Sequence, residues 1–220
     1  MNCTNSSAYI QELYEYAALR GIPEESLFRV ENQDRYIQTA VDAYQQYALF
    51  LHLFRGKYDA DVFQRMMSVD FRSRGSSMAG LSGSESYESV MLIEPPNTRK
   101  TGMADYVHVA RFKDISLLFH PIIYRLESFE AYALKKREPY LDDNTWYLYI
   151  FATQQQYKGK GHGGRLMKLL CSFADEKGYR ICLETNDPDN VGMYEHFGYA
   201  LTDRSRYQDT LDHYIMVYGK

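Results

Sequence analysis

The fold of this chain is decided by residues 145–199, which read TWYLYIFATQQQYKGKGHGGRLMKLLCSFADEKGYRICLETNDPDNVGMYEHFGY. In order, these letters predict a strand (Thr145–Thr153), a glycine loop (158–164), a helix (Arg165–Lys177) and a second strand (Tyr179–Thr185). The first strand is apolar or aromatic at nearly every position, which is typical of a strand covered on both faces. We therefore expect it to lie at the centre of an α/β sheet.

The glycine loop, KGKGHGG, predicts a ligand site. Glycine occupies four of its seven positions, Gly159, Gly161, Gly163 and Gly164. Glycine loses more conformational freedom on folding than other residues, so a simple connection would not need so many, whereas close approach of the backbone to a ligand does. The helix that follows brings its positive end to the same place, and this combination favours phosphate binding.

Three interpretations of the loop need to be compared. They are a dinucleotide-binding fingerprint, a Walker loop, and a flexible turn between strand and helix with no ligand. Residues 159–164 match the dinucleotide fingerprint GxGxxG, and Glu184 stands twenty residues further on, where a ribose-binding acid is expected. However, such a fingerprint normally opens its domain, and the 36 residues after Glu184 are too few for the remaining strands and helices. A Walker loop is excluded because GxxxxGK[ST] does not occur.

Three segments carry a resemblance to a known family. Lys158–Gly163 follows the pattern [Arg/Gln]-Gly-x-Gly-x-[Gly/Ala], Leu183–Asn186 ends a strand, and Asn190–Tyr199 follows Asn-x-x-x-Tyr-x-x-x-Gly-[Phe/Tyr]. In this order and spacing they resemble the GNAT superfamily of acyl-CoA-dependent N-acyltransferases, most closely the small-molecule branch around puromycin N-acetyltransferase. The resemblance covers roughly residues 145–218. It departs from the family pattern at Lys158 and at His162, which replaces a commonly aliphatic residue.

The resemblance implies a GNAT-like α/β fold. We expect a mixed, mostly antiparallel central sheet flanked by helices, with the cofactor in a splay between two parallel strands. A single acyltransferase domain would span residues 1–220. Its parts would be a helical lead (1–25), an acceptor-side half (26–144) with a helical insertion (97–137), and an acetyl-CoA-binding core (145–218).

Outside the core, periodicity and turn signals predict further elements. They are a first strand at Leu27–Glu31, helices from Asp34 to Leu51 and over Asp59–Arg74, a Ser/Gly-rich loop at Gly75–Gly83, a strand at Tyr87–Ile93, helices over Asp105–Phe119 and Tyr124–Lys136, and a last edge strand at Asp212–Tyr218.

Composition limits the classes of binding partner and the cellular compartment that we expect. A formal charge of −4 argues against nucleic acid, and no apolar run approaches the about 18 residues of a membrane span. The first residues lack the pattern of a secretory signal, and Cys3, Cys171 and Cys182 lack metal or redox spacing. We therefore expect a cytoplasmic protein that binds neither a metal nor a membrane. Relatives are often dimers, so a homodimer is a further expectation.

The resemblance implies acetyl-CoA as a co-substrate. Its pantetheine arm would pair like an added strand with the backbone of Phe151, Ala152 and Thr153, and Asn190 would bond to the same arm. The pyrophosphate would bind the loop and its basic side chains, that is Lys158, Gly159, Lys160, Gly161, Gly163 and Gly164.

The resemblance also implies direct acetyl transfer to the primary amine of a small molecule in a ternary complex. Tyr194 would protonate the departing thiolate, because a phenol with a pKa near 10 suits that role. Glu184 is the first candidate for the base that deprotonates the amine, with Glu94 and His120 behind it. Two alternatives stay open, a protein or peptide N-acetyltransferase and a non-catalytic acyl-CoA-binding sensor.

Overall fold

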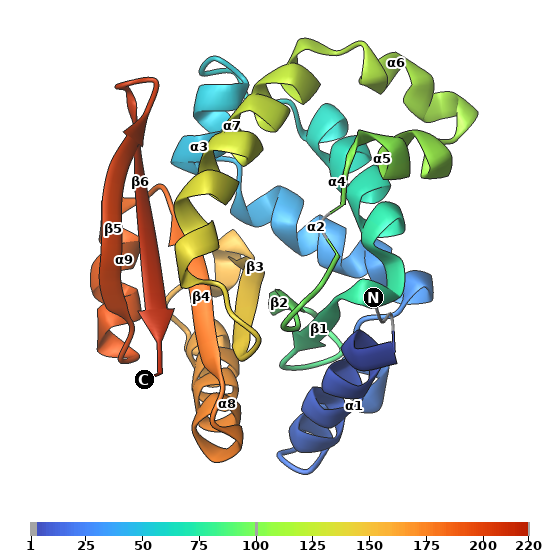
Figure 1. Ribbon diagram of the computed structural model, residues 1–220. Helices are drawn as coiled ribbons and strands as arrows, with labels where there is room; N and C mark the ends of the chain where they lie inside the picture. Colours follow the sequence, from blue (N-terminus) through green and yellow to red (C-terminus); the bar gives the residue numbers. More distant parts are fainter. Residues whose placement is uncertain (1–3, 100, 220) are drawn as a thin grey trace.

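The computed structural model describes residues 4–99 and 101–219, so Cys3 lies outside the described residues. Its centre is a six-stranded sheet with the order β1-β2-β3-β4-β6-β5 (Figure 1). Only the pairing of β3 with β4 is parallel, which confirms the predicted mixed, mostly antiparallel sheet. The strands are β1 (Ala79–Ser82), β2 (Ser89–Glu94), β3 (Thr145–Thr153), β4 (Arg180–Thr185), β5 (Ala200–Tyr207) and β6 (Leu211–Tyr218).

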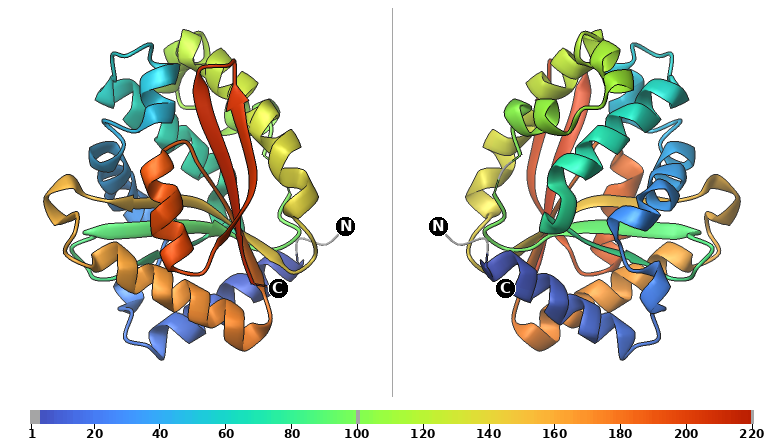
Figure 2. Two further views of the ribbon diagram at one scale, coloured as in Figure 1. Left: turned by 90° about the vertical axis from the view of Figure 1, so that its left-hand side faces the viewer. Right: turned by 90° about the vertical axis from the view of Figure 1, so that its right-hand side faces the viewer.

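Helices cover both faces of this sheet. They are α1 (Thr4–Ala18), α2 (Gln33–Ala43), α3 (Ala48–Leu53), α4 (Ala60–Arg74), α5 (Met103–Val109), α6 (Ile115–Leu118), α7 (Pro121–Arg137), α8 (His162–Lys177) and α9 (Pro188–His196). Figure 2 shows α1 and α8 together on one side of β2 and β3, and α2, α4 and α7 on the other. Each side has its own hydrophobic core. No helix within the described ranges is both long and apolar enough to cross a lipid bilayer.

A bulge in β3 determines which of its side chains face the layer formed by α2, α4 and α7. The β2–β3 register shifts so that Leu92 pairs with Ile150 and Ile93 pairs with Leu148, and Tyr149 is the extra residue. A bulge re-aims the side chains that follow it. Accordingly, Leu148 packs in the α1–α8 core, whereas Ile150 packs in the α2–α4–α7 core.

Strands β3 and β4 pair only at their beginning. The parallel register runs from Thr145↔Arg180 to Leu148↔Leu183, and no β4 residue pairs with Tyr149–Thr153. The two strands therefore separate at their carboxyl ends, which confirms the expected splay.

One predicted strand is absent, and a second is present but does not lie at the edge of the sheet as predicted. Residues 27–31 are not a strand, because the chain there turns through two short 3-10 helices and only the Phe28 amide bonds to the sheet, at Gly80 O (2.9 Å). The first strand is β1, inside the segment predicted as a Ser/Gly-rich loop. The last strand, β6, is internal rather than an edge, because the mostly exposed β5 lies outside it.

Two of the predicted helices are interrupted. The helix expected from Asp34 to Leu51 is divided into α2 and α3, and the helix expected at Asp105–Phe119 is divided into α5 and α6. The helix at Asp59–Arg74 is confirmed as α4, with the Asp59 side chain accepting from the Val62 amide (3.0 Å) as its N-cap.

A substitution at Gly80 in β1 would test how tightly this strand packs on Phe28, which precedes α2. A Cβ at this position would overlap the Phe28 Cβ and lie 2.6 Å from Leu92 Cδ2. We predict that Gly80→Ala lowers the free energy of unfolding by about 1–3 kcal/mol, measured by urea denaturation. Gly192→Ala is the matched control, because Gly192 lies inside α9 with open space around it, so the same change should stabilise by up to about 1 kcal/mol. Equal effects at both positions would contradict this packing.

Candidate active site

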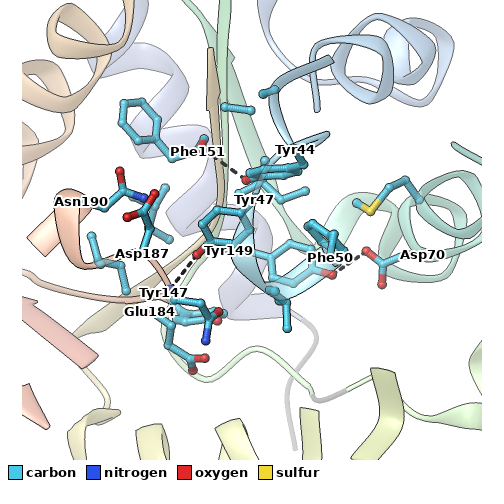
Figure 3. A pocket seen from close by; sticks show the side chains of 18 of the residues that line it. Tyr44, Tyr47, Phe50, Asp70, Tyr147, Tyr149, Phe151, Glu184, Asp187 and Asn190 are labelled. Atoms are coloured by element: carbon cyan, nitrogen blue, oxygen red, sulfur yellow. Dashed lines mark hydrogen bonds between the residues drawn. The ribbon is translucent and has the colours of Figure 1, made fainter. Parts of the chain in front are cut away.

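A cavity of about 1090 Å³ lies at the open end of β3 and β4. The glycine loop and α9 line one part of it, and α2, α4 and α7 line the other. Figure 3 shows Phe151 and Asn190 on one side of the opening, Asp70 on the other, and Tyr44, Tyr47 and Tyr149 between them. The site predicted from the glycine loop and the acceptor wall predicted from the early helices are therefore parts of one space.

The glycine loop has the geometry of an anion cradle. Gly159 (φ 75°) and Gly161 (φ 86°) adopt the left-handed conformation that side chains disfavour. At Gly163 a Cβ would lie 3.0 Å from both Phe151 Cζ and Thr153 Oγ1, so the loop packs directly on β3. Helix α8 starts at His162, and the first amides of a helix lack intrahelical acceptors, so they are available to an anion.

Most of the predicted loop residues line the cavity. These are Lys158, Gly159, Gly161, Gly163 and Gly164. Lys160 is exposed instead, and its ammonium lies 5.3 Å from the centre of the Tyr157 ring.

Alternate residues of β3 direct their backbone groups into the splay. The Tyr44 hydroxyl donates to Phe151 O (3.3 Å), so the backbone of Phe151 faces away from β2. The Gln154 amide donates to Glu88 O (2.9 Å), so the backbone of Gln154 faces β2. Because the direction alternates along a strand, Thr153 faces the splay with Phe151, whereas the Ala152 backbone faces β2. Ala152 lines the cavity as well. Because its backbone faces β2, we expect Phe151 and Thr153, rather than Ala152, to offer backbone groups to a ligand.

Helix α9 places Tyr194 and Asn190 against the splay. Asp187 caps the helix by accepting from the Asp189 amide (3.0 Å). The Asn190 amide group donates to Thr185 Oγ1 (3.1 Å), which holds it at the end of β4. Tyr194 is buried between Phe151 and Tyr199 and lines the cavity, and burial raises its pKa well above the usual value of 10.0. This phenol therefore stays protonated at neutral pH, and the same shift makes it a weaker acid than an exposed tyrosine.

Two buried arginines organise the other half of the cavity. Arg74 Nε donates to Asp70 Oδ1 (2.8 Å), and its guanidinium also pairs with Glu94. The hydroxyls of Tyr106 and Tyr149 both donate to Asp70 (2.9 Å each). We call Asp70, Arg74 and Glu94 the Arg74 cluster.

The second cluster is centred on Arg137 in α7, and it contains the predicted base. Arg137 Nη1 donates to Glu184 Oε1 (2.9 Å), and Arg137 Nη2 lies 3.4 Å from Glu130 Oε2. His213 Nε2 lies 3.0 Å from Glu184 Oε2. Burial opposes ionisation of Glu184, but Arg137 and His213 outweigh it and hold its pKa below 4.5. We call Arg137, Glu130 and Glu184 the Arg137 cluster.

All three predicted candidates for the catalytic base already have partners within the protein. Both oxygens of Glu184 already have partners, and its lowered pKa makes it a weak proton acceptor. Glu94 is paired with Arg74. His120 has a structural contact, because its Nδ1 accepts from the Ile122 amide (3.3 Å) at the start of α7.

The sequence reasoning did not identify most of the acceptor half. The residues that it missed are Tyr44, Asp70, Arg74, Glu130, Arg137 and Tyr149. A signal was present, because Asp70 and Arg74 are four residues apart and so lie on one face of a helix whose other buried residues are apolar. Within the described ranges, no group of three or more His, Cys, Asp or Glu residues could hold a metal ion.

Comparison with known proteins finds that part of this chain is similar to GNAT acetyltransferases. Residues 125–199 match the model of the acetyltransferase (GNAT) family. An uncharacterized N-acetyltransferase of Schizosaccharomyces pombe is 32% identical over 82 residues, which are 37% of this chain and 32% of that protein. The match thus spans about a third of the curated relative.

Solved structures support the fold. A histone acetyltransferase HPA2 and related acetyltransferase from Corynebacterium glutamicum has a TM-score of 0.57 at 16% identity, covering 88% of this chain and 95% of that one. The polyamine N-acetyltransferase of Drosophila melanogaster has a TM-score of 0.55 at 12% identity, covering 88% and 97%. The acetyltransferase (GNAT) family model thus matches about a third of the chain, and the two solved structures share its fold. The puromycin-type branch is not confirmed.

The ion pair of Glu184 predicts a pH-dependent contribution to stability. At pH 7 we expect Glu184→Gln to lower the free energy of unfolding by about 1–3 kcal/mol, because it removes a charged hydrogen-bond partner from Arg137. The folded-state pKa of Glu184 is lowered, so its contribution is complete above pH 4.5 and is lost as the pH falls through the folded value. Urea denaturation between pH 6 and 3 should therefore show the gap between variant and wild type narrowing. Glu15→Gln, an exposed carboxylate on α1, should show little gap; a gap at Glu184 that grows in acid would contradict the account.

Proposed function

We propose that this chain is an acetyl-CoA-dependent N-acetyltransferase that transfers the acetyl group to the primary amine of a small molecule. The observation that carries the proposal is the single cavity, which joins the glycine loop and Tyr194 to an acceptor half walled by α2, α4 and α7. A group bound at the loop can thus reach a second molecule without leaving the protein.

The loop and the splay suit acetyl-CoA. The amides of the glycine loop and the start of α8 would bind the pyrophosphate. The backbones of Phe151 and Thr153 would pair with the amides of the pantetheine arm, as an added strand does. The Asn190 side chain, fixed by Thr185, would bond to the same arm.

The reaction would be direct. The neutral amine nitrogen forms a bond to the thioester carbonyl carbon, and the carbon–sulfur bond breaks. The departing sulfur takes a proton from the hydroxyl of Tyr194, which is protonated at neutral pH because burial raises its pKa. The nitrogen loses one proton as the amide forms, and this proton balances the one that Tyr194 gives to the sulfur. Glu184 is a weak acceptor for it, because Arg137 and His213 already occupy both of its oxygens.

The walls of the acceptor half favour a small molecule over a peptide. Residues of α4, α5 and α7 line the cavity opposite the splay, and the segment from α5 to α7 passes over the end of α4 (Figure 1). A peptide substrate needs an open groove. Among proteins of this fold, the Drosophila enzyme acts on polyamines and forms N-acetylagmatine, which is consistent with a small amine.

The tyrosine gives the sharpest test of catalysis. We predict that Tyr194→Phe lowers kcat by about 10²–10⁴-fold in a CoA-release assay with a panel of primary amines, because it removes the proton donor. Calorimetric titration should show acetyl-CoA affinity close to wild type, with NADH binding to neither protein.

Tyr199→Phe is the matched control. Tyr199 is also buried, its hydroxyl donates to the sulfur of Met167 (3.4 Å) and interacts with the Cys171 thiol, and phenylalanine is compatible with the family motif there. It should keep near wild-type turnover. If wild-type protein binds acetyl-CoA but releases no CoA with any amine, the sensor alternative is favoured. Full activity of Tyr194→Phe would instead contradict the role of Tyr194 as the proton donor.

A further inference from the structure

The acceptor half of the cavity carries more negative than positive charge. Its two arginines are each shared by two carboxylates, Arg74 by Asp70 and Glu94, and Arg137 by Glu130 and Glu184. Each cluster therefore contains one more carboxyl group than guanidinium group. Burying charge without compensation is costly, so this half is suited to a ligand that brings positive charge.

Among the four carboxylates of the two clusters, Glu130 has the longest contact with its arginine. Its oxygen is 3.4 Å from Arg137, compared with 2.9 Å for Glu184, which also has His213. The Glu130 side chain keeps 37% of its surface accessible, against 10% for Glu184. Because Glu130 lines the cavity, it can offer an oxygen to a ligand there.

The two clusters act on Glu130 together. Burial raises the pKa of Glu130, Arg137 opposes this, and Glu184, Arg74 and Asp70 also act on it. The groups of both clusters are thus near enough to influence one carboxylate. A cation placed against Glu130 would favour its ionised form and offset the cost of burial.

Aromatic rings line the space beside these carboxylates. Tyr147 and Tyr149 line the cavity on β3, and Tyr106 lines it on α5. Arg137 lies 4.6 Å from the centre of the Tyr147 ring, and Arg74 lies 4.1 Å from that of Tyr149. Aromatic faces and carboxylates together accept alkyl chains that end in a cation.

Glu130 and Asp70 are not among the groups that would carry out acetyl transfer. Asn190 and Phe151 lie on one side of the opening and Asp70 on the other (Figure 3). An amine that reacts at the Tyr194 side therefore leaves the rest of its chain directed toward the two clusters.

We infer that the acceptor carries a second cationic group, as in a diamine or an aminoalkyl guanidine, and that Glu130 binds this group with the help of Asp70. This inference rests on the proposed function and names its substrate class. Glu130 acts here as a specificity residue and not as the base.

Direct binding tests the inference without relying on turnover. We would titrate the protein, without acetyl-CoA, with unbranched diamines of three to six carbons, with the monoamine of the same length, and with the amino alcohol that has a neutral end. At least one diamine should bind about tenfold or more tightly than both of its matched partners, since a hydrogen bond to a charged group contributes that much. Equal affinity across the matched sets, or no binding of any diamine, would overturn the inference.

Variants locate the site. Glu130→Gln should bring the diamine-to-monoamine ratio close to one, Glu130→Asp should restore part of it, and Glu15→Gln on α1 should leave it unchanged. Glu130→Gln should lower diamine turnover by a larger factor than monoamine turnover, and an equal loss of both would instead assign Glu130 to catalysis. Acetyl-CoA titration of the same variants separates the two claims: normal acetyl-CoA binding without diamine preference contradicts only this inference, whereas no acetyl-CoA binding contradicts the proposed function.

Discussion

The separation of β3 from β4 after Leu148 is the constraint on which the site depends. Parallel pairing stops after four residue pairs, and the β3 edge beyond it turns backbone groups toward a cavity instead of a neighbouring strand. Open backbone groups away from water must find partners, and the Tyr44 hydroxyl supplies one for Phe151 O. The bulge at Tyr149 adds a second consequence, because it directs that ring to Asp70 on α4. One irregular strand thus serves both halves of the cavity.

The glycine loop is fixed by the same strand. Gly163 lies so close to Phe151 and Thr153 that a side chain would press on both. The start of α8 and the open edge of β3 therefore hold a set relative position, and α9 adds Tyr194 against the ring of Phe151. Movement of any one of these elements would change the distance between the anion cradle and the proton donor.

The sequence predicts this part of the protein well because the information there is local. The bounds of β3, the glycine loop and the Asn190–Tyr194 spacing follow from periodicity, backbone freedom and a contiguous motif. The acceptor half was predicted only as a helical wall. Asp70 lies on α4, whereas Glu130 and Arg137 lie on α7, and nothing in the local pattern of either helix says that these side chains line one cavity. Strand β1 was missed because four residues within a Ser/Gly-rich segment acquire their conformation from pairing with β2.

The most direct test of the account is amide hydrogen exchange by NMR, with and without saturating acetyl-CoA. If the ligand adds itself to the open edge of β3, the Phe151 and Thr153 amides should exchange more slowly when it is bound, and so should the amides of Gly161, Gly163 and Gly164. The Ala152 amide, which faces β2, should change little and serves as the internal control. Saturation that leaves Phe151 and Thr153 unchanged, or protects all three residues of β3 alike, would contradict binding in the splay.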